Sequence, residues 1–240
     1  MREALRSVRQ FARRRAGFVG SVVEVRPEPG MIVLTYDDGP EPGGTEPVLD
    51  ALAKHHATAT FFVLLTRVRR YGSLLEEIVA AGHEIALHGI DHRRLTDFSP
   101  VEVHRRTADG RAELEDTTGR PVTWMRPPYG RQTLFTYLAI RRSGLVPVLW
   151  GPTTWDSYDI PQHARVSKAQ EGARSGAILL AHDGFASEMD GAHDGPAPAV
   201  DRGELSDRVL QEYGLRGLSG HSLGDALRSG TAVREARFPT

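Results

Sequence analysis

The stretch Thr35-Tyr36-Asp37-Asp38-Gly39-Pro40 follows the apolar run Met31-Ile32-Val33-Leu34 and ends it with two adjacent carboxylates and a Gly-Pro pair. Neighbouring side chains of an extended strand point to opposite faces, so both carboxylates reach one pocket only if the chain bends there. A Gly-Pro pair is typical of such a bend. We expect a strand that ends in a site where one carboxylate binds a metal and the other stays free as a base. An isolated Asp-Asp pair would more often cap a helix or fix a turn.

Apolar runs alternate with helical patterns along the rest of the chain. The expected strands span residues 31–35, 59–63, 84–87, 123–125, 147–150 and 177–181. The expected helices span residues 45–55, 72–81, 100–118, 134–143 and 204–213, and a final strand-helix segment spans 217–229. This alternation predicts an α/β fold with parallel strands, either a barrel or a doubly wound sheet. Residues 183–201 are expected to form a long loop, and loops of that length are commonly functional.

The composition is that of an ordinary globular protein, with 40% hydrophobic and 25% charged residues in a chain of 240. A net charge of −1 gives no general reason to expect a nucleic acid as partner. Because the chain has no cysteine, disulfides, thiol catalysis and thiolate metal sites are excluded. No Pro/Gly-rich linker divides the sequence, so we expect a single domain over residues 29–240.

A basic segment precedes this domain. Arg2, Arg6, Arg9 and Arg13 fall at helical spacing, which predicts a basic helical extension over residues 1–28. A secretory signal needs roughly 7–15 consecutive apolar residues, and the arginines at 13–15 interrupt any such run. No other stretch approaches the ~18 apolar residues of a membrane span. We therefore expect a cytoplasmic protein whose extension is a solvated helix, with contact to an anionic membrane or a partner as the alternative.

Polar side chains follow successive expected strands at their C-terminal ends, the rim where parallel α/β folds build their sites. They are Asp37, Asp38, His88, His92, Arg126, Tyr129, Trp155, Asp156, His182 and Asp183. The i, i+4 spacing of His88 and His92 puts both imidazoles on one side of a helical turn, and one carboxylate completes a two-histidine metal site. Such a histidine pair is weak evidence alone, and its place among the other strand-end residues strengthens it.

Four motifs in this order resemble those of the polysaccharide deacetylase family, also called carbohydrate esterase family 4 or the NodB-homology domain. The stretch 35–40 matches the first family motif, Thr-Phe-Asp-Asp-Gly-Pro, and HGIDH at 88–92 matches the second, His-(Ser/Thr)-x-x-His. RPPYG at 126–130 matches the third motif, and LAH at 180–182 matches the fifth, Leu-x-His. The matched stretch runs from about residue 32 to residue 227, nearly the whole chain.

The resemblance implies a deformed (β/α) barrel with one divalent metal ion held by Asp38, His88 and His92. Zinc is the first choice for this ion, and cobalt, manganese, nickel or iron also suit these ligands. The implied reaction removes an N-acetyl group from an amino sugar, as metal-bound water attacks the amide carbonyl.

The resemblance also implies roles for the other strand-end residues. Asp37 would be the general base, paired with Arg126, and His182 would be the general acid, paired with Asp156. Oxyanion and substrate contacts would come from Tyr129, Pro127 and Trp155.

Two departures from the family pattern concern this site. Gly89 replaces the Ser or Thr after the first metal histidine, so a hydroxyl that would support a ligand is lost. The fourth motif, Asp-x-x-Asp-Trp, reads TTWDS at 153–157, and only its second Asp remains, as Asp156. In the family the missing Trp helps to form an apolar groove for the acetyl methyl, so its absence leaves the acyl group and the substrate open.

The leading hypothesis is therefore a deacetylase of a small amino-sugar glycoside, an oligosaccharide or a biosynthetic intermediate. The alternatives are hydrolysis of a non-sugar amide or N-formyl group, and an inactive carbohydrate-binding remnant. A lid made by residues 183–201 would favour a small substrate, and an open groove a polymer. The aromatic residues Trp150 and Trp155 are expected in the core rather than as a sugar platform. We expect a solvated loop to carry Tyr158, Asp190 and Asp194, with contact to the substrate as the alternative.

Overall fold

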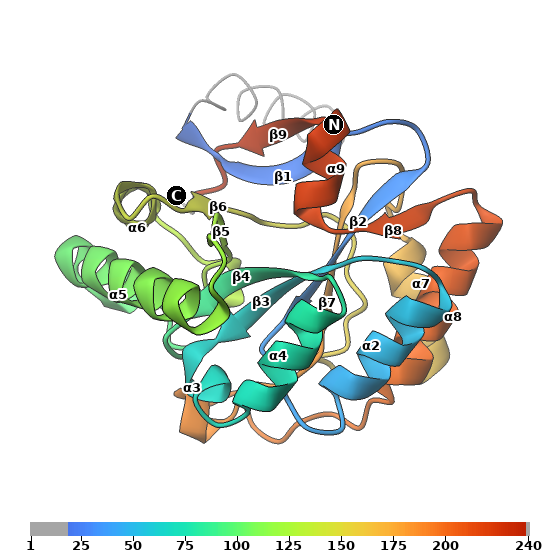
Figure 1. The fold of residues 1–240 in the computed structure, drawn as a ribbon, viewed down its shortest axis with the longest axis horizontal. Coiled ribbons are helices and arrows are strands. Elements are labelled where there is room, and N and C mark those ends of the chain that lie inside the picture. Colours follow the sequence, from blue (N-terminus) through green and yellow to red (C-terminus); the bar gives the residue numbers. More distant parts are fainter. Residues whose placement is uncertain (1–18, 239–240) are drawn as a thin grey trace, which may run out of the picture.

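The computed structural model describes residues 19–238 (Figure 1). Its strands are β1 (Ser21–Arg26), β2 (Met31–Asp37), β3 (Thr60–Leu64), β4 (Glu84–Gly89), β5 (Trp124–Met125), β6 (Val146–Pro147), β7 (Ile178–His182), β8 (Ser219–His221) and β9 (Thr231–Glu235). Its α-helices are α2 (Thr45–Lys54), α3 (Leu65–Val68), α4 (Gly72–Ala80), α5 (Pro100–Thr118), α6 (Leu134–Arg142), α7 (Gln162–Gln170), α8 (Arg202–Leu215) and α9 (Leu223–Ser229). Short 3-10 turns are η2 (Leu95–Asp97), η3 (Pro128–Gly130) and η4 (Glu188–Asp190). Among these helices, none has the length and apolar character that a membrane crossing requires.

The central sheet is parallel and runs in the order β6-β5-β4-β3-β2-β7, with β8 pairing to the first residues of β2. It curls into a barrel because the segment after β6 bonds to β7. The Gly151 N–H donates to the Ile178 carbonyl at 3.0 Å, and the Thr154 N–H donates to the Leu180 carbonyl at 3.1 Å. The sheet therefore closes through a few single hydrogen bonds rather than a regular ladder, which makes this a deformed barrel.

A two-stranded antiparallel ribbon of β1 and β9 covers the N-terminal end of the barrel (Figure 1). The Leu149 N–H donates to the Val22 carbonyl at 2.8 Å, and the Val25 N–H donates to the Gly176 carbonyl at 2.9 Å. Val22 and Val25 are fully buried with side chains of α9 and of the barrel strands. β1 is therefore part of the barrel's closure and not an appendage.

The two faces of each barrel strand bury different layers of core. In β2, Val33 packs inside the barrel with Phe62, whereas Ile32 and Leu34 pack outward in the larger core beneath the helices. Because side chains alternate along a strand, Thr35 and Asp37 share the interior face with Val33. The same alternation therefore carries polar residues into the barrel at its C-terminal rim.

Helices cover the outside of the barrel. Figure 1 shows α2, α7 and α8 on one side and α5 and α6 on the other. The longest helix, α5, begins after Ser99, whose hydroxyl accepts the Glu102 N–H at 3.2 Å, and ends at Gly119 with a positive φ of 63°. These are a side-chain N-cap and a left-handed C-terminal residue, which set the helix bounds in the sequence.

Most of the predicted elements are confirmed to within a few residues, including the α/β barrel class. The predicted helical extension was wrong for the part that the structure describes, because residues 21–26 form strand β1. Residues 1–18 lie outside the described residues. The sequence analysis also missed β9 and α7. The short strand predicted at 147–150 is shifted, because β6 spans Val146–Pro147.

The close approach of β1 to the segment before β7 gives a stability test. A Cβ at Gly176 would lie 2.0 Å from the Val25 carbonyl oxygen, and Gly176 also has a φ of +83°. Gly172, with a φ of +78°, has nothing within 4 Å of the same position. We expect Gly172→Ala to cost about 1–2 kcal/mol of unfolding free energy from φ alone. Gly176→Ala should cost a further ~1–3 kcal/mol from overpacking.

Urea unfolding followed by circular dichroism measures both substitutions. Equal losses for Gly176→Ala and Gly172→Ala would show that β1 does not pack against this segment.

Candidate active site

The two adjacent carboxylates at the end of β2 point in different directions. Asp37 continues the interior face of the strand and is 3% exposed. Asp38 has a φ of +74°, an uncommon left-handed conformation for a residue other than glycine. This turn brings the Asp38 carboxylate against the loop after β7, where its Oδ2 accepts the Ala186 N–H at 3.3 Å. The predicted bend therefore lies at Asp38 itself, one residue before the Gly-Pro pair.

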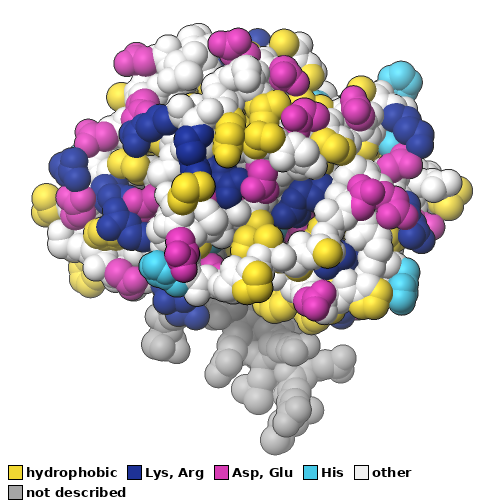
Figure 2. Space-filling model, turned by 90° about the horizontal axis from the view of Figure 1, so that it is seen from below, with side chains coloured by type: hydrophobic (Ala, Val, Ile, Leu, Met, Phe, Trp, Pro, Cys, Tyr) yellow, Lys and Arg dark blue, Asp and Glu magenta, His cyan; other side chains and the backbone are white. Residues whose placement is uncertain are grey.

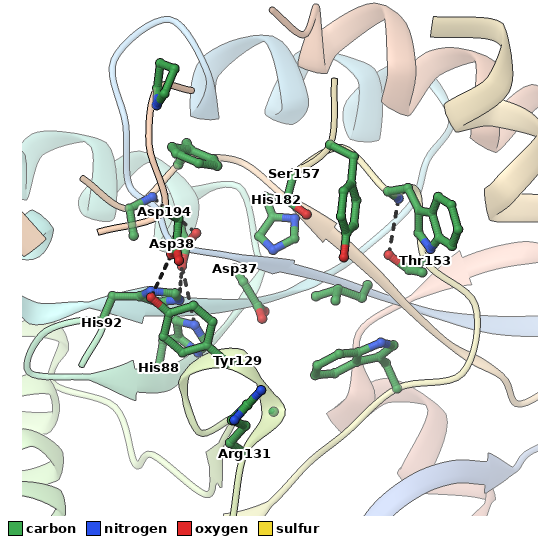
Figure 3. A pocket seen from close by; sticks show the side chains of 18 residues that line it. Asp37, Asp38, His88, His92, Tyr129, Arg131, Thr153, Ser157, His182 and Asp194 are labelled. Carbon is green, nitrogen blue, oxygen red and sulfur yellow. Dashed lines mark hydrogen bonds and ion pairs between the residues drawn. The ribbon is translucent and has the colours of Figure 1, made fainter. Parts of the chain in front are cut away.

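Asp38 lies against the two histidines predicted to bind metal. Its Oδ1 is 3.4 Å from the Nε2 of His88 and 3.4 Å from the Nε2 of His92. One ligand atom from each residue lies within 4.8 Å of the others, and all three residues are buried. Figure 3 shows the three side chains converging at one end of the pocket. The structure thus assembles the predicted metal site.

The chemistry of these three groups fits a divalent cation. The His88 Nδ1–H donates to the Arg126 carbonyl at 2.8 Å, which leaves Nε2 as the free ligand atom. Asp38 Oδ1 is buried and has no hydrogen-bond partner among the described residues. Burial opposes ionisation of Asp38, but His92 and His88 outweigh it and hold its pKa well below the usual range. An ionised, orphaned carboxylate oxygen between two imidazoles is a set that metal ions satisfy.

Asp37 is paired with Arg126, as the resemblance implies. The Arg126 Nη1 donates to Asp37 Oδ1 at 2.6 Å and to Thr35 Oγ1 at 2.9 Å. The guanidinium is fully buried and lies over the rings of Phe62, at 4.2 Å, and Trp150, at 5.5 Å. The pair therefore fixes one oxygen of Asp37 behind the pocket wall.

His182 is paired with Asp156 and lies beside Asp37 in the register of β2 and β7. The His182 Nδ1 is 2.7 Å from Asp156 Oδ1, and the His182 N–H donates to Asp156 Oδ2 at 2.8 Å. Burial lowers the pKa of His182, but the Asp156 carboxylate outweighs this and raises it to about 9. The imidazole is therefore protonated at neutral pH. Asp156 itself is 1% exposed.

Arg202 of α8 supports the His182 pair and was missed from the sequence. Its Nη1 donates to the His182 carbonyl at 3.2 Å and lies 3.6 Å from Asp156 Oδ2. A second missed contact is the Ala186 N–H, which donates to Asp38 Oδ2 at 3.3 Å. No local motif marks either contact, because both depend on how distant segments pack.

The third motif shapes the pocket floor. Tyr129 has a φ of +60° and sits in η3, where the Gly130 N–H donates to the Pro127 carbonyl at 2.9 Å. A Cβ at Gly130 would lie 2.5 Å from the Trp150 ring, so the turn packs tightly on that indole. Tyr129 lines the pocket, whereas Pro127 is buried behind it and shapes the turn.

These groups surround one cavity of about 620 Å³ (Figure 3). The loop 183–201 supplies part of its wall with Phe185, Ala186, Asp194 and Pro196. Figure 2, which looks onto this edge of the barrel, shows acidic, basic and hydrophobic side chains intermixed. The predicted long loop thus borders the site.

The expectations for Trp155 and Asp190 were wrong. Trp155 is 41% exposed and lines the cavity rather than the core. Trp150 packs against the core, as expected, and also lines the cavity. Tyr158 and Asp194 are exposed, as expected for a solvated loop, and both line the cavity. Asp190 is fully buried rather than solvated, and its Oδ2 accepts from Arg67 Nη2 at 2.8 Å. These residues anchor the loop and shape the pocket.

The departure at Gly89 has a local steric cause. A Cβ at this position would lie 2.7 Å from the Asp91 carbonyl oxygen. The tight turn between the two histidines therefore leaves no room for the Ser or Thr of the family motif. The backbone carbonyl of Arg126 orients His88 instead.

Comparisons with known proteins agree with this geometry. A family model described as polysaccharide deacetylase matches residues 24–148, just over half of the chain. A chitooligosaccharide deacetylase of Bradyrhizobium sp. (strain ANU 289) is 36% identical over 157 residues, covering 64% of this chain and 71% of that protein. A solved peptidoglycan N-acetylglucosamine deacetylase superposes with a TM-score of 0.75 at 20% identity, covering 86% and 92% of the two chains. A solved pseudoenzyme of carbohydrate esterase family 4 from Bacillus anthracis gives 0.72 at 21% identity, covering 85% and 68%.

The fold and the site together define a hydrolase with a metal centre on a deformed (β/α) barrel. The chain belongs to the polysaccharide deacetylase family. It is accordingly a deacetylase, a hydrolase of carbon–nitrogen bonds other than peptide bonds.

The charge on His182 gives a direct spectroscopic test. Asp156 stabilises the imidazolium, so Asp156→Asn should move the His182 titration midpoint from about 9 down by roughly 1–3 pH units. NMR of ¹³C-labelled histidine rings measures the midpoint. Asp159→Asn, which removes an exposed acid from the same segment, should leave it in place. An unmoved midpoint in Asp156→Asn would show that another group charges His182.

Proposed function

We propose that this protein removes the N-acetyl group from an N-acetylglucosamine-type unit of a glycoside or short oligosaccharide. The observation that carries the proposal is that one group of three residues and two ion pairs surround a single cavity. They are the Asp38, His88 and His92 cluster, the Asp37–Arg126 pair and the His182–Asp156 pair. The similarity to a protein named chitooligosaccharide deacetylase supports the sugar class.

The metal ligands are Asp38, His88 and His92, and zinc is the ion we propose, with cobalt, manganese, nickel and iron as compatible ions. A divalent ion there supplies Lewis acidity to the amide carbonyl and to the attacking water.

Asp37 takes the proton of the attacking water. Arg126 holds Oδ1, so the proton is received at Oδ2. The buried salt bridge prevents Asp37 from turning away, and it separates this carboxylate from the one that binds metal. As water adds to the carbonyl carbon, negative charge develops on the carbonyl oxygen, where the backbone N–H of Tyr129 can donate to it.

His182 supplies the proton that the leaving nitrogen needs. An amine is a poor leaving group as an anion, so breaking the C–N bond requires protonation of nitrogen. Asp156 holds Nδ1 and keeps the ring charged, so the proton leaves from Nε2. The products are acetate and a free amino sugar.

The wall near His182 offers an apolar place for the acyl methyl despite the missing motif Trp. Leu180 and Trp150 both line the cavity. These side chains support an acetyl group, and a formyl group would fill the same space less completely. The exposed aromatic residues Trp155 and Tyr158 on the same cavity favour a sugar over a non-sugar amide.

The alternative of an inactive remnant has a precedent in the fold, since a related structure is described as a pseudoenzyme. In this chain both the Asp37–Arg126 pair and the His182–Asp156 pair are present and buried. Neither pair binds the metal directly, so a protein that only held a metal or a sugar would have no use for them.

Substitution of Asp37 separates catalysis from metal binding. We expect Asp37→Asn to lower kcat by about 100- to 10,000-fold, because a positioned general base contributes that much. The same variant should retain one metal ion, whereas His88→Ala should lose both metal and turnover. Asn is chosen because its side-chain carbonyl can still accept a hydrogen bond from the buried Arg126, whereas Ala would remove that acceptor.

Acetate release from N-acetylglucosamine oligomers and metal content by mass spectrometry measure both effects. His104→Ala, at an exposed histidine, serves as the control for metal content. Wild-type turnover in Asp37→Asn would rule out the base assignment.

A further inference from the structure

One hydrogen bond separates two cavities at the rim of the barrel. The catalytic cavity, of about 620 Å³, and a neighbouring cavity of about 370 Å³ share three lining residues, His92, Tyr129 and Asp194. The Tyr129 hydroxyl donates to Asp194 Oδ2 at 2.7 Å, and this contact joins the third motif to the loop 183–201. The Tyr129–Asp194 bridge therefore divides what would otherwise be one continuous groove into two cavities.

Several contacts support the Tyr129–Asp194 bridge. The Tyr129 ring packs on His92, with centroids 4.4 Å apart, and the Arg94 guanidinium lies 4.8 Å from its centroid. The His92 N–H donates to the Asp190 carbonyl at 2.7 Å, which ties the loop to the metal-binding segment. Asp190 in turn is paired with Arg67. The wall at this end rests on a buried ion pair as well as on the bridge.

The opposite end of the catalytic cavity is open and aromatic. Figure 3 shows Asp194 and His92 at one end and Thr153 at the other, with Asp37 and His182 between them. The Trp155 N–H donates to Thr153 Oγ1 at 3.3 Å, which places Trp155 at the open end.

Trp155 and Tyr158 form an exposed platform at this open end. Trp155 is 41% exposed and Tyr158 is 58% exposed, and their rings lie 5.4 Å apart. The Lys168 ammonium lies 4.3 Å from the Trp155 centroid. Trp155 also has a φ of +54°, a strained conformation for a bulky residue, and such strain gathers at ligand sites. Exposed aromatic rings beside a catalytic cavity suit the apolar face of a pyranose ring.

We propose that the cavity takes the end of a glycan chain, with the N-acetylated terminal unit against the Tyr129–Asp194 bridge and the next unit on Trp155 and Tyr158. The bridge stops the chain from continuing past His92, so internal units do not reach the catalytic groups. This inference rests on the proposed function for its reaction, and it adds the direction and the chain-end selectivity of the substrate.

The product pattern on β-linked N-acetylglucosamine oligomers of one to five units tests the bridge. Mass-spectrometric sequencing should find that the wild type deacetylates a terminal unit only. Asp194→Ala opens the groove and should add internally deacetylated products, and Tyr129→Phe, which keeps the ring and the backbone N–H, should do the same. Glu188→Ala, the same charge change at an exposed position of the loop, should keep the wild-type pattern.

The dependence of kcat/KM on chain length tests the platform. The second sugar unit should raise kcat/KM about tenfold, the typical size of one aromatic contact. Tyr158→Ala should remove most of this gain by lowering kcat/KM for the dimer more than for the monomer, and Tyr158→Phe should restore it. Internal products from the wild type would overturn the inference. So would unchanged products from both bridge variants, or an equal loss for monomer and dimer in Tyr158→Ala.

A binding measurement separates this inference from the proposed function. Isothermal titration calorimetry of Asp37→Asn with the same oligomers needs no turnover. Tighter binding of the dimer than of the monomer, abolished by Tyr158→Ala, supports the chain-end site even if the wild type releases no acetate. Equal affinities for all lengths overturn it even if acetate release is observed.

Discussion

The left-handed turn of the backbone at Asp38 is the constraint on which the site depends. Up to Asp37, β2 follows the alternation of a strand, so Asp37 points into the barrel towards Arg126. Without the turn, the next carboxylate would face outward among the helices, away from His88 and His92. The φ of +74° at Asp38 instead directs it to the rim, 3.4 Å from both imidazoles. Two identical neighbouring side chains therefore acquire different partners, one a metal site and the other an arginine.

The same alternation places the remaining groups, and burial makes each of them need a partner. Ile178 packs inside the barrel, so Leu180 and His182 of the same strand face the pocket from β7, where His182 lies beside Asp37 in register. A buried charge is stable only when it is paired. Asp156 stabilises the protonated form of His182. Arg126 donates hydrogen bonds to Asp37 and to Thr35. Each buried charge of the site therefore has a partner of opposite charge. The loop 183–201 completes the site through the Ala186 N–H on Asp38.

The sequence predicted the fold class from local patterns of apolar strands and helical periods. The full metal-ligand set and both ion pairs were predicted from the resemblance of the strand-end motifs to the polysaccharide deacetylase family. The sequence mispredicted what depends on distant packing. β1 has the burial pattern of a strand only because β9 and the barrel end lie against it, and the arginine-rich segment before it suggested a helix. Trp155 was expected in the core, but it is 41% exposed and has a positive φ that no propensity indicates. Asp190 was expected to be solvated on a loop, because its partners Arg67 and Arg70 are distant in the sequence and meet it only in the folded structure.

The division of labour between the two carboxylates is tested most directly by anomalous scattering from crystals of the zinc-loaded protein. We expect one anomalous peak at about 2.0–2.2 Å from Asp38 and from the Nε2 atoms of His88 and His92. Asp37 should remain on Arg126 and outside the first coordination sphere. A metal ion bridged by both aspartates, or an Asp37 released from Arg126, would show that the two carboxylates do not have separate roles.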